Sequence, residues 1–302
     1  MTTPAPRAPA GTPVTQGVTV ITDSTACLPP TLASELAVEV VPVPLVFAGG
    51  EEHDDGTLTA AEFKELVRTK GPAATSAPAP GRYLEAMRSA RRRSPAVLCL
   101  TVSAAFSMMH DSASRAAEML REEAPRTDVL VVDSGNAAMA QGFAAIAAAR
   151  AARGGASLAD CRLAAESVAG AAHLVFAIDD LGHLARSGRV PHVLAWAAGM
   201  LKVKPIVHYH RGNVRLLERV RTKERALRRL EELAGELVAG EQGALHVAVQ
   251  HSESREAARS LAEGLARRYQ PVEMLSTEFT QVMTAHTGPG LVGVAVYRDG
   301  PA

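Results

Sequence analysis

The sequence predicts an α/β fold with two domains, and two observations lead to that prediction. Short apolar runs alternate with polar loops and helix-length segments over residues 18–170. This alternation is typical of a parallel sheet with helices on both faces. Later, the turn His210-Arg211-Gly212 joins two strand-like segments as a hairpin, which implies a mixed sheet. We therefore expect an α/β/α domain with a parallel sheet over residues 17–170 and a smaller α/β domain with a mixed sheet over residues 171–302.

Four apolar runs in the first half have the length of strands: residues 18–22, 38–47, 96–100 and 128–132. Runs without a polar face suit strands that are buried on both sides of a parallel sheet. Helix signals lie between these runs: Pro29-Pro30, a capping box from Thr59 to Glu62, and apolar helical spacing near Tyr83 and Leu120. After the last run, an Ala-rich helix is expected over 138–153 and a further helix over 157–169.

In the second half, predicted strands occupy residues 174–178, 204–209, 213–220, 245–250, 272–280 and 291–297. Helices are expected over 179–187, 222–237 and 254–269, and Gly188 stands at the C-terminal cap of the first. Asp179 and Asp180 could bind a cation. Because helix N-termini favour acidic residues, we prefer the capping interpretation.

Composition limits the class of protein. The 302 residues are 47% hydrophobic and 21% charged, as in soluble globular proteins. The net charge is zero, which favours neither nucleic acid nor a membrane surface as a partner. Since no apolar run reaches about 18 residues, we expect no membrane-spanning helix.

The cysteines and the N-terminus indicate the compartment. Cys27, Cys99 and Cys161 are odd in number and have no CxxC spacing, which argues against disulfides and zinc and fits a reducing cytoplasm. Residues 1–16 are rich in Pro, Ala and Thr and lack the apolar core of a signal peptide. We expect this segment to be a disordered tail.

Several catalytic and cofactor motifs are missing from the sequence. It contains no GxGxxG, no GxxxxGK[ST], no GxSxG and no HExxH, so nucleotide binding by those devices, a nucleophile elbow and a zinc site are not expected.

Small polar residues follow the predicted strands instead. Examples are Asp23-Ser24-Thr25, Ser103 with Ser107, and Asp133-Ser134. In open α/β sheets ligands bind at the carboxyl ends of strands, although such residues also cap helices and form turns. Thr75 and Ser76 in the loop 71–81, and His286 before a Gly-Pro-Gly turn, could face the same crevice between the domains.

A basic run crosses the second half of the chain. It consists of Arg215, Arg219, Arg221, Lys223, Arg225, Arg228 and Arg229, interspersed with glutamates. The run can be a solvated surface or a docking surface for an acidic partner or a phosphate.

Seven short motifs occur in one order along the chain: ITDSTACLP (21–29), TSAP (75–78), DSGNAAMAQG (133–142), GRV (188–190), KPI (204–206), ERVRT (218–222) and HTGPG (286–290). Together they resemble the DegV family, the fatty-acid-binding proteins that serve bacterial fatty acid kinase. The resemblance covers nearly all of residues 18–297.

The resemblance implies that one long-chain fatty acid lies with its tail in a tunnel and its carboxylate at the domain interface. It places the carboxylate-binding residues at Thr75, Ser76, Ser103, Ser107 and His286. A basic residue that docks the kinase falls near Arg219 or Arg221. The separate kinase binds ATP and phosphorylates the acid, so this chain would be a cytoplasmic, non-catalytic carrier without a cofactor or metal. We expect a monomer.

The chain departs from the family pattern Ser-Ser-x-Leu-Ser-Gly-Thr-Tyr after residue 102. Ala104 replaces the second serine, and Phe106-Ser107-Met108-Met109-His110 replaces the last five residues. Methionine adopts positive φ with difficulty, so we expect a different loop path or fewer donors for the carboxylate.

Two alternatives remain open at this stage. The chain could be a dihydroxyacetone-kinase-like protein, which binds a small carbonyl substrate through covalent chemistry at a histidine. It could also be a regulatory module that uses the basic run at 215–229.

Overall fold

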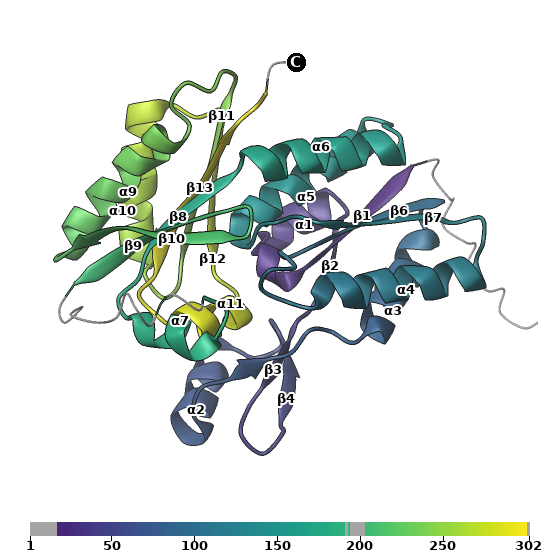
Figure 1. The fold of residues 1–302 in the computed structure, drawn as a ribbon, viewed down its shortest axis with the longest axis horizontal. Coiled ribbons are helices and arrows are strands. Elements are labelled where there is room, and N and C mark those ends of the chain that lie inside the picture. The colour runs from purple at the N-terminus through teal and green to yellow at the C-terminus, as the bar shows by residue number, and fades with distance from the viewer. Residues whose placement is uncertain (1–16, 191–192, 194–202, 301–302) are drawn as a thin grey trace, which may run out of the picture.

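The computed structural model describes residues 17–190, 193 and 203–300, so the tail predicted for residues 1–16 lies outside the described residues. A parallel sheet organises the first half of the chain (Figure 1). Its strand order is β2-β1-β6-β7, formed by Glu39–Val41, Val18–Asp23, Ala96–Thr101 and Asp128–Asp133. All three strand pairs are parallel, as predicted. Every residue of β6 is buried, because this strand lies between β1 and β7 under helices.

Helices lie on both sides of this sheet, as the alternating pattern predicts. Helices α3 (Pro80–Arg91) and α4 (Met109–Glu123) pack together on one side, and α5 (Ala138–Arg153) and α6 (Leu158–Ala171) on the other (Figure 1). Helix α5 contacts both β1 and the second sheet. Its Ala-rich sequence fits this position, since a helix that is buried almost all round needs small apolar residues.

The prediction of one strand over residues 38–47 was wrong. Strand β2 belongs to the parallel sheet, whereas β3 (Pro44–Val46) forms a small antiparallel sheet with β4 (Glu52–Asp54) and β5 (Ala74–Thr75). Pro42 and Pro44 lack the N–H that a continuous ladder requires, so the chain changes sheets between them. Helix α2 (Ala60–Lys70) begins at the predicted Thr59–Glu62 capping box.

The second half forms the predicted mixed sheet, of order β10-β9-β8-β13-β11-β12. Its strands are His173–Ala177 (β8), Lys204–His210 (β9), Asn213–Val220 (β10), Leu245–His251 (β11), Glu273–Glu278 (β12) and Val292–Arg298 (β13). The β11–β12 pair is parallel, and the other pairs are antiparallel. Helices α9 (Lys223–Leu237) and α10 (Arg255–Tyr269) pack on its outer face with one apolar cluster.

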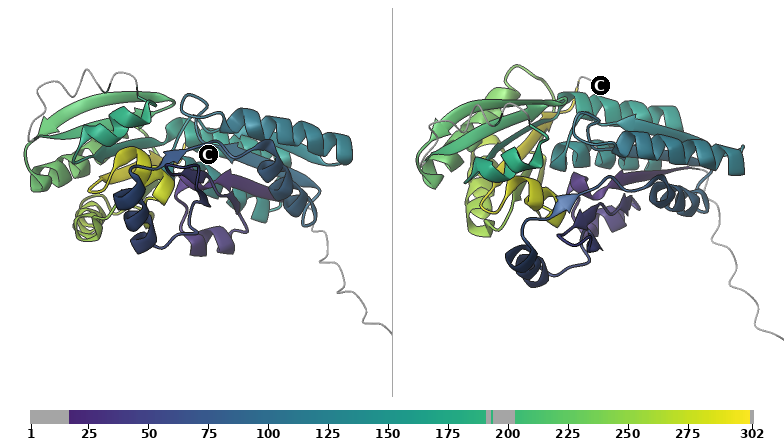
Figure 2. Two further views of the ribbon diagram at one scale, coloured as in Figure 1. Left: turned by 90° about the horizontal axis from the view of Figure 1, so that it is seen from below. Right: turned by 60° about the horizontal axis from the view of Figure 1, so that its bottom comes forward.

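The inner face of the mixed sheet joins the core of the first half. One large apolar cluster contains residues from both halves, among them Phe143 of α5 and Tyr297 of β13, whose rings make an edge contact. Figure 2 shows the mixed sheet at one end of the molecule and the parallel sheet at the other. Short helices α1 (Pro30–Glu35), η1 (Ser24–Ala26), α7 (Leu181–Ser187) and α11 (Gln281–Thr287) complete the described elements. A domain boundary near residue 170 stays a prediction.

Candidate functional site

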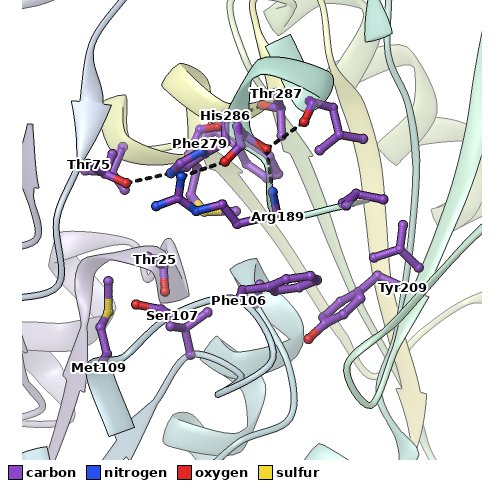
Figure 3. Close-up of a pocket in the computed structure, with 18 of the residues that line it drawn as sticks. Thr25, Thr75, Phe106, Ser107, Met109, Arg189, Tyr209, Phe279, His286 and Thr287 are labelled. Atoms are coloured by element: carbon purple, nitrogen blue, oxygen red, sulfur yellow. Dashed lines mark hydrogen bonds between the residues drawn. The ribbon is translucent and has the colours of Figure 1, made fainter. Parts of the chain in front are cut away.

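A mostly apolar cavity lies where the two sheets approach each other (Figure 3). One wall consists of residues that follow the carboxyl ends of parallel strands, such as Thr25 after β1 and Val102 after β6. The opposite wall is the inner face of the mixed sheet, which contributes Leu174, Phe176 and Tyr209. This is the edge where ligands bind in open α/β sheets.

The polar groups of the cavity are not spread evenly. Thr75 and Ser76 come from β5 and the residue after it, Ser107 from the loop before α4, and His286 from α11. The wall formed by β8, β9 and β10 contributes apolar and aromatic side chains. An elongated molecule with one polar end matches this distribution.

Thr75 and His286 join the two halves of the chain inside the cavity. Thr75 Oγ1 and His286 Nε2 lie 2.8 Å apart and share a hydrogen bond (Figure 3). Burial, together with the positive charge of Arg189, lowers the pKa of His286 to about 4. The imidazole is therefore neutral at pH 7, and it can act as a hydrogen-bond donor or acceptor but not as a cation.

His286 lies in the last turn of α11, not in the turn that the sequence predicts at residues 286–290. Contacts with the first half hold this helix in place. Ser24 Oγ donates to Asp55 Oδ2 at 2.6 Å, and Asp55 Oδ1 accepts from the Val282 N–H at 3.3 Å. Gln281 Nε2 donates to the Leu58 carbonyl at 2.7 Å. Burial raises the pKa of Asp55.

Four of the five predicted carboxylate-binding residues line the cavity: Thr75, Ser76, Ser107 and His286. Ser103 does not belong to the lining. It is buried, and its hydroxyl oxygen accepts a hydrogen bond from the Ala105 N–H at 3.3 Å, while its own N–H donates to Asn136 O at 2.8 Å. Ser103 thus supports the loop that presents Ser107 and does not face the cavity.

Arg189 also lines the cavity, although its residue type did not mark it as a site residue in the sequence. It follows Gly188, which caps α7 with φ 68°, and its guanidinium donates to the Ser187 carbonyl at 2.6 Å. The side chain lines the cavity yet is exposed to solvent. Its only signal in the sequence is the Gly-Arg-Val motif.

Comparison with known proteins settles the family. The sequence model described as "Uncharacterised protein, DegV family" matches residues 17–299. The chain belongs to the DegV family. A DegV domain-containing protein of Streptomyces coelicolor is 36% identical over 282 residues, which cover 92% of this chain and 98% of that protein.

Solved structures of DegV proteins share the fold. A DegV family protein from Thermus thermophilus, described as fatty acid binding, superposes with a TM-score of 0.85 at 26% identity, covering 94% of this chain and 100% of that one. Bacillus subtilis DegV, described as a fatty acid binding protein, gives a TM-score of 0.82 at 29% identity over 94% and 100% of the two chains. The fold class predicted from the sequence is thereby confirmed.

The loop that departs from the DegV pattern needs no positive φ. Met108 precedes α4 with φ −81° and ψ 13°, which any residue adopts. Its side chain is 65% exposed, whereas Met109 is buried and lines the cavity. Replacement of the usual glycine therefore leaves the backbone unstrained.

The basic run of this DegV protein is divided between the two faces of the edge strand β10. Arg215 pairs across the sheet with His208, and Arg219 with Pro205, but a bulge between Leu216 and Glu218 shifts the alternation. Since cross-strand partners share a face, Arg215 lies on the face of His208, and Arg219 on the face that turns towards the cavity.

Arg219 and Arg221 are exposed, and no ion pair joins either of them to another residue within 17–190, 193 and 203–300. Arg229, in contrast, pairs with Glu218 at 2.6 Å and also contacts Glu232. Arg229, at the end of the run, is thus paired within the chain, whereas Arg219 and Arg221 are exposed.

The part of the chain that the structure describes contains no group of three or more His, Cys, Asp or Glu side chains able to hold a metal, and no helix long and apolar enough to cross a membrane. Asp180 Oδ1 accepts from the Gly182 N–H at 2.8 Å, and Asp179 pairs with Lys204 at 2.6 Å. The capping interpretation of Asp180 is confirmed.

Proposed function

We propose that this protein binds a long-chain fatty acid, with the carboxylate among Thr75, Ser76, Ser107 and His286 and the tail along the mixed sheet. The observation that carries the proposal is the mostly apolar cavity, in which Thr75 and His286 share a hydrogen bond and Ser76 and Ser107 also line the wall. Each buried methylene contributes roughly 0.8 kcal/mol, so the tail supplies affinity. The DegV structures described as fatty acid binding support the same ligand class.

Hydroxyl groups and a neutral imidazole suit a carboxylate that must give up water. A carboxylate transferred into such a site needs several hydrogen bonds to offset its desolvation. Thr75, Ser76 and Ser107 offer hydroxyl donors, and Arg189 supplies the positive charge near His286. Ser103 serves indirectly in this proposal, by supporting the Ser107 loop.

The protein acts as a carrier and not as an enzyme in this proposal. It presents the carboxylate to a separate ATP-dependent fatty acid kinase in the cytoplasm, as a monomer, and needs no cofactor of its own. Exposed Arg219 and Arg221, which lack internal ion pairs in the described chain, offer a docking site for acidic residues of the kinase.

Native mass spectrometry tests the ligand class. After gentle purification, and after incubation with C14 to C18 saturated and unsaturated acids, the protein should carry one acyl-sized adduct that denaturation releases. A protein that stays free of ligand in both preparations would refute the proposal. A covalent adduct with dihydroxyacetone, or turnover of it by this chain alone, would favour the small-carbonyl alternative, which the apolar lining disfavours.

A further inference from the structure

The cavity has a well-defined apolar end. Tyr209 of β9 pairs with Leu174 of β8 on one side and with Val214 of β10 on the other. All three side chains line the cavity, so they form one row across three strands. The next residue of β9 on this face would be Arg211, which belongs to the hairpin turn. The inner face of the sheet therefore ends at this row.

Phe106 closes the row from the opposite wall. Its ring lies 5.0 Å from the ring of Tyr209 at an angle of 36°, and Figure 3 shows the two rings side by side along the floor of the cavity. Tyr209 is only 2% exposed, and its hydroxyl donates to Gly135 O at 2.8 Å. A ring held at both its face and its hydroxyl cannot move aside for a longer ligand.

Two of the polar groups, Thr75 and His286, lie at the other end of β8, whereas Ser107 directly follows Phe106 in the sequence. Helix α7 follows the carboxyl end of that strand and contacts α11, the helix that carries His286. Leu174, in contrast, lies at the beginning of β8. A chain that starts at His286 and follows β8 thus points at the Phe106–Tyr209 pair.

We infer that the Phe106–Tyr209 pair, backed by Leu174 and Val214, is the end wall that sets the length of the acyl tail. The inference rests on the proposed function and adds which residues select the ligand. Phe106 contributes a full aromatic ring to this wall. An apolar pocket discriminates one methylene by about 10-fold or more, which gives the wall a measurable effect.

The experiment is a competition in which the protein is loaded with an equimolar mixture of saturated C12 to C20 acids and the bound acids are quantified by native mass spectrometry. Phe106→Ala should enrich acids longer than those bound by the wild type, on the order of 10-fold for the first disfavoured length. Phe106→Leu should shift the profile in the same direction by less. Val214→Phe adds bulk to the same wall and should shift it towards shorter acids.

Phe143→Leu is the matched control, since Phe143 is equally apolar, fully buried and packed on Tyr297 away from the cavity lining. It should keep the wild-type profile. Variants of Phe106 and Val214 that load acid with an unchanged length profile would overturn the inference while leaving the proposed function intact. A wild-type protein that binds none of the acids would instead refute the proposed function itself.

Discussion

Thr75 Oγ1 lies 2.8 Å from His286 Nε2, although 211 positions separate the two residues in the sequence. The bond connects a two-residue strand of the small sheet with a seven-residue helix of the second half. Neither element has much internal stability, so each depends on packing and on contacts such as Ser24–Asp55–Val282 for its position. The polar end of the cavity is therefore a product of tertiary structure.

His286→Ala should weaken fatty-acid retention by about 10- to 100-fold, because a hydrogen bond to a charged group contributes about 1.5–3 kcal/mol. Titration calorimetry with palmitate measures the change. His53→Ala is the control, since His53 hydrogen-bonds Glu51 on the small sheet and does not line the cavity. Equal affinity of wild type and His286→Ala would remove His286 from the site.

Ser103→Ala should weaken retention less than His286→Ala does, because Ser103 does not line the cavity and its hydroxyl contacts its own loop and Tyr209. Its main effect should be a loss of about 1 kcal/mol in the free energy of unfolding, the value of one buried hydrogen bond. Denaturant titration measures that loss. A Ser103→Ala protein of normal stability that loses its ligand would show that Ser103 contacts the carboxylate directly.

Stability should decrease as the pH falls from 6.5 to 4. Burial lowers the pKa values of His173, His208 and His286 to about 4, so in this range the unfolded chain binds more protons than the folded one. The stability that these groups contribute is present above pH 6.5 and is lost as the pH approaches 4. Thermal melts across this range give the slope, which His173→Asn with His208→Asn should reduce. An unchanged slope would contradict the assignment.

Glu273→Gln should destabilise the contact between the two halves. Burial disfavours the Glu273 carboxylate, yet hydrogen bonds from His246 and Arg150 outweigh it and lower its pKa to about 2. The contribution of Glu273 is present above pH 4.5 and is lost as the pH falls towards 2. Burial also opposes protonation of His246, but Glu273 and Asp299 raise its pKa, so its contribution is present below pH 6.5 and disappears as the pH rises through the raised pKa.

We expect Glu273→Gln to lower the melting temperature by several degrees near pH 5.5, where both groups are charged. Glu65→Gln removes the exposed Arg68 pair on α2 and should have almost no effect, since solvent screens the charges of exposed pairs. Equal melting temperatures for the two variants would show that the Arg150–Glu273–His246 contact adds nothing.

Arg219→Glu with Arg221→Glu should abolish acyl-phosphate formation by a fatty acid kinase and leave fatty-acid retention unchanged. Each single variant, Arg219→Glu or Arg221→Glu, should weaken coupling, whereas Arg215→Glu, which makes the same charge change as either single variant but lies on the opposite face of β10 from Arg219, should leave it intact. If the double variant still supports the kinase, Arg219 and Arg221 are not the docking site. If Arg215→Glu also abolishes coupling, the effect depends on net charge.

Buried strands, helix caps and the hairpin could be predicted from the sequence because each has a local signal. The run 96–100 has no polar face and is buried, and the Thr59–Glu62 capping box begins α2. Strand β5 and helix α11 could not be predicted in this way. With two and seven residues respectively, they are too short to show a hydrophobic period, and residues distant in the sequence stabilise them. The position of Ser103, which is buried and does not line the cavity, also depends on a distant residue, because its N–H donates to the carbonyl of Asn136.

The bulge in β10 could not be predicted either, because it also depends on residues distant in the sequence. Simple alternation would place Arg215 and Arg219 on one face, whereas the extra residue Leu217 places them on opposite faces. Strand pairing decides this, and the alternation of residues alone gives no sign of it.

One carbonyl group ties the hairpin to the first half of the chain. The oxygen of Gly135 accepts hydrogen bonds from the Tyr209 hydroxyl and from the Gly212 N–H, each at 2.8 Å. Lifting the hairpin would break both bonds together, whereas Arg189, which lines another part of the cavity, is exposed to solvent. In the proposed binding mode a fatty acid would enter beside Arg189 tail first and would stop with its carboxylate near that end, where a separate kinase could reach the head group without removing the tail from the protein.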